Sequence, residues 1–290
     1  MTDTGAVSGA GVSVIGGRAR NEDAYLAESP VFVVADGMGG HIAGAEAAWA
    51  AVTAFRALAG EPATPADVER AHLEARRLVD GVQEEVGGES GTTLTGAIAV
   101  THRGHPWWMV INVGDSRTYA LEGGVLRQIS VDHSHVQELV TAGRITPAQA
   151  LVHPDRNILT RAVGDHQTRM DAWLVPHVPG RRLVIASDGL MKEVEDAEIG
   201  EIVGLIGDAE AAAAALVELA VGRGARDNVT VVVADSDLVT PVDADPSPWT
   251  LWGTMRARTP APTPPRASGA GATHDGRRPH RTVPPRGCPR

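Results

Sequence analysis

Two stretches of the sequence share one design, in which an apolar run ends at an Asp-Gly pair. Residues 31–35 are apolar and lead into Asp36 and Gly37, and the largely apolar residues 183–187 lead into Asp188 and Gly189. A short apolar run bounded by turn residues is typical of a strand buried on both faces. Either stretch alone fits equally well a strand and a tight turn in which the aspartate caps the next helix. The repetition favours two buried strands that each present a carboxylate at their end.

Size and composition bound the class of protein. The chain has 290 residues, of which 43% are hydrophobic and 3% aromatic, so it can bury a sizeable core built mostly from small side chains. The single cysteine, Cys288, cannot form a disulfide within the chain and is poorly placed as a nucleophile. We find no signal peptide and no apolar run of membrane-spanning length, which predicts a soluble cytoplasmic protein. A Walker phosphate loop and a serine nucleophile elbow are also missing from the sequence.

Charge and proline content divide the chain. The last fifty residues hold eleven prolines, eight arginines and three aspartates, a composition that cannot bury enough apolar surface to fold. We therefore expect a flexible segment over residues 1–10, one folded domain over 11–238 and a Pro/Arg-rich disordered tail over 239–290. The body before the tail is strongly acidic, which argues against binding to nucleic acid and is compatible with metal cations.

Two helices are predicted after the first Asp-Gly stretch. Apolar residues at spacings of three and four, including Trp49 and Phe55, indicate a helix after Gly44 that buries both aromatic side chains. A second helix is expected to begin at Thr64 and Pro65, because a hydroxyl N-cap followed by proline is a start signal. We expect the two helices to lie antiparallel over one face of a sheet.

Further carboxylates lie at strand ends or turns. Asp115 interrupts a strand-turn-strand pattern, and Asp227 precedes a β-branched strand. Glu22 and Asp23 belong to a polar cluster whose simplest interpretation is a solvated loop. The alternative is a neighbouring strand on which they face Asp36.

These carboxylates together suit a hard divalent cation. Oxygen ligands without a His or Cys pattern favour Mg²⁺ or Mn²⁺ over Zn²⁺. Two such ions about 3.5–4 Å apart can share a water, lower its pKa and hold it for in-line attack on phosphorus. Arg18 offers a guanidinium fork that matches two phosphate oxygens.

Eight motifs in order resemble the bacterial branch of the protein phosphatase 2C family, the metal-dependent PPM serine/threonine phosphatases. They are RARNEDA (18–24), VVADGMGGHIAG (33–44), SGTTL (90–94), VGDSRTY (113–119), VDHS (131–134), NILTRAVG (157–164), ASDGL (186–190) and RDNVTVVV (226–233). The resemblance implies an α/β fold, a four-layer αββα sandwich of two antiparallel sheets flanked by helices, with the metal centre at one end between the sheets.

The resemblance also implies roles for single residues. Asp36 would bridge two ions, the Gly37 carbonyl would join one, and Asp188 and Asp227 would complete the pair. Arg18 would hold the phosphate. The remaining roles are a third metal site at Asp115 and supporting positions around the ligands at Glu22, Asp23 and Asn228.

Histidines are less well assigned by the resemblance. Animal members carry a histidine directly after the Asp-Gly pair, where this chain has Met38. His41 is the nearest histidine, and it either protonates the leaving alkoxide through water or only braces the glycine loop. The bracing role is favoured for His41, and a structural role is favoured for His133.

The implied activity is hydrolysis of phosphoserine or phosphothreonine on proteins, with Mn²⁺ or Mg²⁺ as cofactor and no phosphoenzyme. The expected partners are phosphorylated targets of Ser/Thr kinases, and the expected state is a monomer that binds neither nucleic acid nor membrane. Two alternatives stay open: a PPM-fold regulatory binding protein with weak catalysis, and a phosphatase dedicated to a phosphorylated anti-anti-sigma-type regulator.

Overall fold

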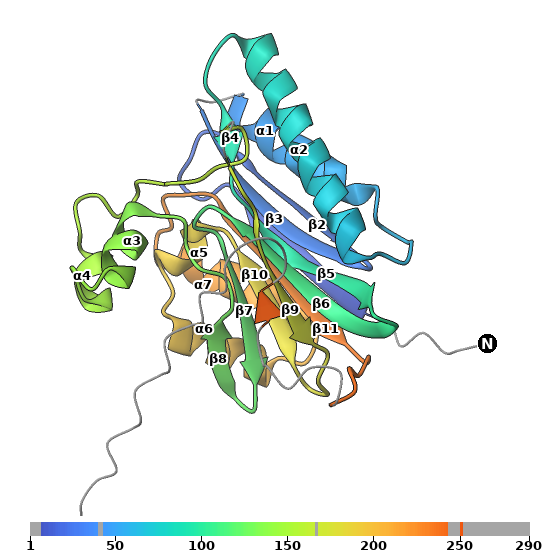
Figure 1. Ribbon diagram of the computed structural model, residues 1–290. Coiled ribbons are helices and arrows are strands. Elements are labelled where there is room, and N and C mark those ends of the chain that lie inside the picture. The colour runs from blue at the N-terminus through green and yellow to red at the C-terminus, as the bar shows by residue number, and fades with distance from the viewer. Residues whose placement is uncertain (1–6, 40–42, 166–167, 243–249, 252–290) are drawn as a thin grey trace, which may run out of the picture. The chain divides into compact units, whose positions relative to one another are not determined.

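The computed structural model describes residues 7–39, 43–165, 168–242 and 250–251, whose strands form two antiparallel sheets (Figure 1). The five-stranded sheet has the order β1 (Val7–Val14), β11 (Val229–Ser236), β10 (Arg182–Ala186), β7 (Arg117–Glu122) and β8 (Val125–Gln128). The seven-stranded sheet has the order β12 (Thr250–Leu251), β9 (Asp171–Pro176), β6 (His105–Val113), β5 (Leu94–His102), β3 (Val31–Met38) and β2 (Asp23–Glu28), and β4 (Gly91–Thr92) pairs with β3.

Helices cover the outer face of each sheet, as Figure 1 shows. α1 (Ala43–Arg56) and α2 (Pro65–Val86) share one hydrophobic core with the seven-stranded sheet. α5 (Asp188–Met191), α6 (Asp196–Leu205) and α7 (Ala209–Gly222) share another with the five-stranded sheet. α3 (His135–Thr141) and α4 (Pro147–Leu151) lie on the excursion between β8 and β9. The predicted αββα sandwich is confirmed. None of the described helices has the length and apolar character needed to cross a bilayer.

Strand alternation determines which side chains meet between the sheets. On β3, Val31, Val33 and Ala35 pack toward α1 and α2, whereas Phe32 and Val34 belong to the core between the sheets. Because successive side chains on a strand point to opposite faces, the next residue on the inner side is Asp36. The apolar strand therefore delivers its carboxylate between the two sheets.

The helix predictions hold with one correction. Thr64 caps α2, its side chain and that of Asp67 form a capping box, and Gly87 closes the helix in the left-handed conformation. Phe55 is fully buried, but the prediction that Trp49 belongs to the core is wrong, because its side chain is 53% exposed. α1 packs through a stripe containing Ala47, Ala51 and Phe55, and Trp49 lies on the opposite side of the helix.

Only a few residues of the predicted tail, 239–242 and 250–251, are described. β12 pairs with β9, and Thr240 Oγ1 accepts a hydrogen bond from the His177 backbone N–H and donates one to the Pro106 carbonyl. Ordered contacts thus continue past residue 238. The rest of the tail, including Cys288, lies outside the described residues, as does the whole second unit, Arg256–Arg290. Disorder of the tail stays a prediction.

His177 makes the fold sensitive to acid. It is buried against Trp108 with a ring-centroid distance of 4.7 Å, and burial lowers its pKa to about 4. An unfolded chain protonates this histidine near pH 6.5, so the folded state loses stability as the pH falls from 6.5 toward 4. We expect His177→Phe to gain about 3 kcal/mol of unfolding free energy over wild type between pH 7 and pH 4. Urea unfolding of both proteins in EDTA measures this difference, and parallel pH profiles would contradict it.

Candidate active site

Asp23 and Asp36 are direct cross-strand partners on β2 and β3. The interpretation that Asp23 sits on a neighbouring strand facing Asp36 is therefore confirmed, and the solvated-loop alternative fails for Asp23. Asp23 is buried, and its Oδ2 accepts hydrogen bonds from Ser187 Oγ at 2.8 Å and Thr230 Oγ1 at 2.6 Å. Thr230 lies on β11 of the other sheet and Ser187 directly follows β10, so these bonds join the two sheets at the site.

Asp188 and Asp227 reach the same place from the five-stranded sheet. Asp188 opens α5 directly after β10, and Asp227 lies just before β11, the neighbour of β10. Asp115 follows Gly114 in the turn between β6 and β7. The structure therefore brings together the predicted ligand carboxylates, although they are up to 191 positions apart in the sequence.

Burial and crowding of these carboxylates shift their pKa values. Burial raises the pKa of Asp36 well above its usual range, and the charges of Asp23, Asp188, Asp115 and Asp227 raise it further. Burial also raises the pKa of Asp23 to about 6, although the Thr230 and Ser187 hydroxyls oppose it. The pKa of Asp115 is raised to about 7 by burial and by the charge of Asp188. So much negative charge in one place calls for a cation.

Two cationic side chains contact this cluster. Lys192 Nζ lies 2.5 Å from Asp188 Oδ2 and 2.8 Å from Asp227 Oδ2. Arg18 pairs in a bidentate manner with Asp227, with Nε 2.9 Å from Oδ1 and Nη2 3.0 Å from Oδ2. Burial would raise the pKa of Asp227, but hydrogen bonds from Lys192 and Arg18 keep it lowered. Burial alone would lower the Lys192 pKa, yet the two carboxylates raise it.

Lys192 is the contact that sequence reasoning missed. The sequence contains no other lysine, and this one stands four residues, about one helical turn, after Asp188. That spacing was the available signal. Arg18, expected to face phosphate, instead holds a predicted metal ligand in this structure, and its side chain is 57% exposed.

The donor set fits a hard divalent cation. Asp188 Oδ1 and Asp23 Oδ1 are buried, and neither has a hydrogen-bond partner within the described part of the chain. Buried carboxylate oxygens without partners are costly and are the ligands that Mg²⁺ and Mn²⁺ prefer. No three acidic, histidine or cysteine side chains among the described residues converge as a ready-made metal group. The ammonium of Lys192 bridges Asp188 and Asp227 in this arrangement.

Glycines after the two aspartates are required by backbone packing. A Cβ on Gly37 would lie 2.0 Å from the Gly44 carbonyl oxygen, and one on Gly189 would lie 2.0 Å from the Asn228 carbonyl oxygen. Any side chain there would push apart the segments that hold the aspartates. The ligand role that the resemblance implies for the Gly37 carbonyl stays a prediction.

Asn228 fastens the segment that carries Arg18. Its Nδ2 donates to the carbonyls of Ile15 at 2.9 Å and Arg20 at 2.8 Å, and its Oδ1 accepts from the Glu22 N–H at 2.9 Å. The Glu22 carbonyl accepts in turn from the Gly37 N–H at 3.2 Å. Asn228 and the Glu22 backbone thus position the loop beside Asp36 and Asp227.

His133 braces the turn that bears Asp115. Its Nδ1 accepts a hydrogen bond from the Gly114 backbone N–H at 3.1 Å, and its backbone N–H donates to the Gly114 carbonyl at 2.8 Å. Its Nε2 lies 3.2 Å from Asp171 Oδ2. These contacts are those of a structural residue. His41 lies outside the described residues, so its two possible roles stay as predictions.

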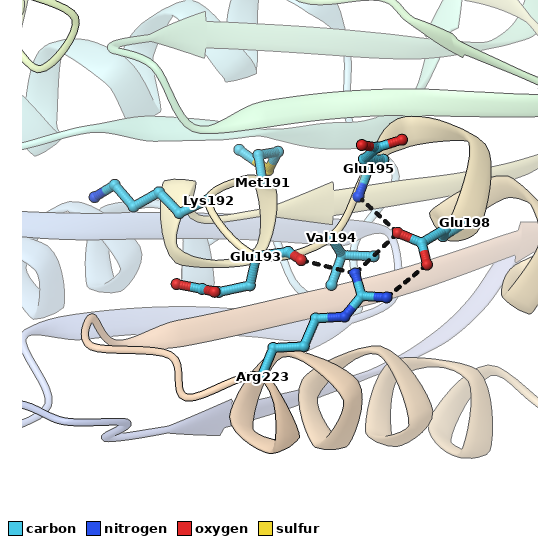
Figure 2. Close-up of a pocket in the computed structure, with 7 residues that line it drawn as sticks. All are labelled: Met191, Lys192, Glu193, Val194, Glu195, Glu198 and Arg223. Carbon is cyan, nitrogen blue, oxygen red and sulfur yellow. Dashed lines mark hydrogen bonds and ion pairs between the residues drawn. The ribbon is translucent and has the colours of Figure 1, made fainter. Parts of the chain in front are cut away.

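A pocket of about 450 Å³ adjoins the cluster at Lys192 (Figure 2). Figure 2 shows the Glu198–Arg223 ion pair on one side and the Lys192 side chain pointing away from it on the other. The pocket is lined by the segment after α5, by α6 and by the end of α7, through Met191, Lys192, Glu193, Val194, Glu195, Glu198 and Arg223.

Several known proteins are similar to this chain in sequence and architecture. A family model described as protein phosphatase 2C matches residues 10–219. The chain is 36% identical over 223 residues to the serine/threonine protein phosphatase PstP of Mycobacterium tuberculosis, which covers 75% of this chain but only 42% of that protein. It is 35% identical over 233 residues to the serine/threonine phosphatase stp of Listeria monocytogenes, covering 77% of this chain and 89% of that protein. A crystal structure of the PstP catalytic domain in complex with two manganese ions aligns with a TM-score of 0.71 at 34% identity, over 80% of this chain and 99% of that one.

Proposed function

The chain belongs to the protein phosphatase 2C family, and from that premise we propose that it hydrolyses phosphoserine and phosphothreonine on proteins with two Mn²⁺ or Mg²⁺ ions. The observation that carries the proposal is the convergence of Asp36, Asp188 and Asp227 from two sheets, with Asp188 Oδ1 left without a partner in the described part of the chain. The related PstP catalytic domain, crystallised with two manganese ions, supports the choice of cofactor.

The ligands follow from the geometry and the family. Asp36, Asp188, Asp227 and the Gly37 carbonyl would hold the two ions, and Asp115 would contribute to a third site. When bound, the ions would supply the positive charge that lowers the pKa of an attacking water and stabilises the phosphate. Asp23, tied by Ser187 and Thr230, would keep the two sheets at the spacing that the ligands need.

Arg18 would receive the phosphate. In this structure its guanidinium binds both oxygens of Asp227, which is the planar two-point contact it would make with two phosphate oxygens. Its exposure leaves it accessible to a phosphorylated side chain. A phosphate dianion would replace Asp227 on the Arg18 guanidinium, at the edge of the carboxylate cluster. There the positive charge of the guanidinium would stabilise the transition state.

The clients are proposed to be phosphorylated cytoplasmic proteins, targets of Ser/Thr kinases, that a monomeric enzyme acts on as part of signalling. A binding protein without catalysis is disfavoured, because Arg18, Asp36, Asp188 and Asp227 are all present.

Turnover of a phosphothreonine peptide tests the function. Wild type is expected to release phosphate with Mn²⁺ and to lose that activity in EDTA. Asp188→Ala is expected to lower kcat/KM by at least about a thousandfold, because it removes a carboxylate that would hold the ions. Asp80→Ala, in the outer helix α2, is the matched control and keeps wild-type turnover. Metal-dependent turnover retained by Asp188→Ala would overturn the assignment.

A further inference from the structure

Lys192 is placed where a metal ion would be expected to act. Its Nζ contacts Asp188 Oδ2 and Asp227 Oδ2 at 2.5 and 2.8 Å, so one ammonium bridges two carboxylates that leave different strands of the sheet. Lysine carries a compact point charge on a flexible stem, so its ammonium can occupy the place of a bound cation. Lys192 lies at the C-terminal end of α5, one turn after Asp188, and its side chain is 39% exposed.

The bridge explains two other observations. The described residues contain no ready-made group of three metal-binding side chains, although five carboxylates crowd together. Asp188 uses Oδ2 for the lysine, while its buried Oδ1 has no partner within the described part of the chain. The cluster is therefore neutralised in part by a side chain and still offers an oxygen for a further cation.

We propose that Lys192 is a built-in cation that holds Asp188 and Asp227 together in the metal-free protein and is displaced when a divalent ion binds. It lowers the affinity of the site for metal and sets the metal concentration at which the site fills. This inference rests on the proposed function, because it takes the same two carboxylates as metal ligands.

The adjoining pocket gives the displaced ammonium a place to go. Lys192 lines the pocket together with Glu193, whose carboxylate lies on the same side of Figure 2 as the lysine ammonium and offers a new partner. Glu198 is engaged by Arg223 through contacts of 2.6 and 2.9 Å. In the proposed displacement, rotation of the Lys192 side chain exchanges the two aspartates for Glu193.

Titration calorimetry with Mn²⁺ tests the displacement directly, without reference to turnover. Lys192→Met keeps the apolar stem and removes the charge, and it is expected to bind Mn²⁺ about tenfold more tightly than wild type, since two partly exposed ion pairs no longer compete. Lys192→Arg restores the competing cation and is expected to return the affinity toward wild type. Arg223→Met is the matched control, because it removes one positive charge from the same pocket but contacts Glu198 instead of the aspartates.

A second measurement follows the metal-free protein. In EDTA, Lys192→Met is expected to melt at a lower temperature than wild type, because Asp188 and Asp227 lose their bridge, and to gain more in Tm on addition of Mn²⁺. Lys192→Gln repeats both measurements if the methionine variant does not fold.

Each outcome is decisive. Unchanged or weaker Mn²⁺ binding by Lys192→Met and Lys192→Gln would overturn the inference, as would an equal gain in Arg223→Met, which would indicate a long-range charge effect. If wild type binds Mn²⁺ and hydrolyses the phosphopeptide while the charge-removing variants Lys192→Met and Lys192→Gln bind Mn²⁺ as wild type does, only the inference fails. Absence of Mn²⁺ binding in every protein would overturn the proposed function as well.

Discussion

Asp36→Asn is expected to abolish metal-dependent turnover while raising the melting temperature of the metal-free protein. Burial raises the pKa of this carboxyl, the charges of Asp23, Asp188, Asp115 and Asp227 raise it further, and both effects oppose the ionised form. Asparagine keeps the shape and removes the charge, so the folded state no longer bears that cost. The same change removes a carboxylate that would hold the ions, and we expect kcat/KM to fall by at least about a thousandfold.

The pH dependence separates charge from packing. A raised carboxyl pKa destabilises the folded state above the unfolded-state value, and the cost disappears as the pH falls to about 3.9. The Tm advantage of Asp36→Asn in EDTA should therefore be largest near neutral pH and shrink on acidification. Asp80→Asn in α2 is the control and should follow wild type. A variant that melts below wild type at pH 7 in EDTA, or that keeps turnover with Mn²⁺, would contradict this account.

Asn228→Ala is expected to damage stability and turnover together. The side chain is buried and makes three hydrogen bonds to the backbone of Ile15, Arg20 and Glu22. Leaving these groups without partners should lower the unfolding free energy by about 3 kcal/mol, at about 1 kcal/mol for each bond. Arg18 lies on the segment that these bonds fasten, so misplacement of its guanidinium should lower kcat/KM by about a hundredfold.

Urea unfolding and peptide kinetics measure the two effects of Asn228→Ala. Asn157→Ala replaces an exposed asparagine and should change neither. A double-mutant cycle with Arg18→Ala identifies the route: if Asn228 acts by positioning Arg18, the kinetic losses will not add. Additive losses would show that Asn228 supports the site in another way.

Much of the fold could be predicted from the sequence because local signals and global structure agree. Apolar runs that end in Asp-Gly are buried strands, and the Thr64 cap and Gly87 stop mark α2 correctly. Resemblance supplied the pairing of the sheets, which no local pattern encodes. Trp49 shows the limit of periodicity: a helix that packs through alanines turns a large aromatic residue to solvent, and spacing alone does not identify the buried side.

The site was predictable as a set of residues but not as a set of contacts. Asp23 faces Asp36 because β2 and β3 pair in that register, which the sequence offered only as the alternative to a solvated loop. The hydroxyls that hold Asp23 come from Ser187 and Thr230, more than 160 positions away, and only the folded chain brings them near. The four-residue spacing could link Lys192 to Asp188, but its second contact is with Asp227, 35 positions away, and no local pattern signals that contact.

The position of β11 has a consequence for biosynthesis. This strand lies between β1 and β10, pairing Val7 with Ser236 at one end and Val14 with Val229 at the other. As the ribosome makes the chain from its N-terminus, β1 must wait for residues 229–236, and β10 keeps an open edge until then. Open edges recruit other chains, so the nascent protein depends on protection until β11 has emerged. Asp227 arrives with that strand, so the carboxylate cluster is complete only after β11 has been made.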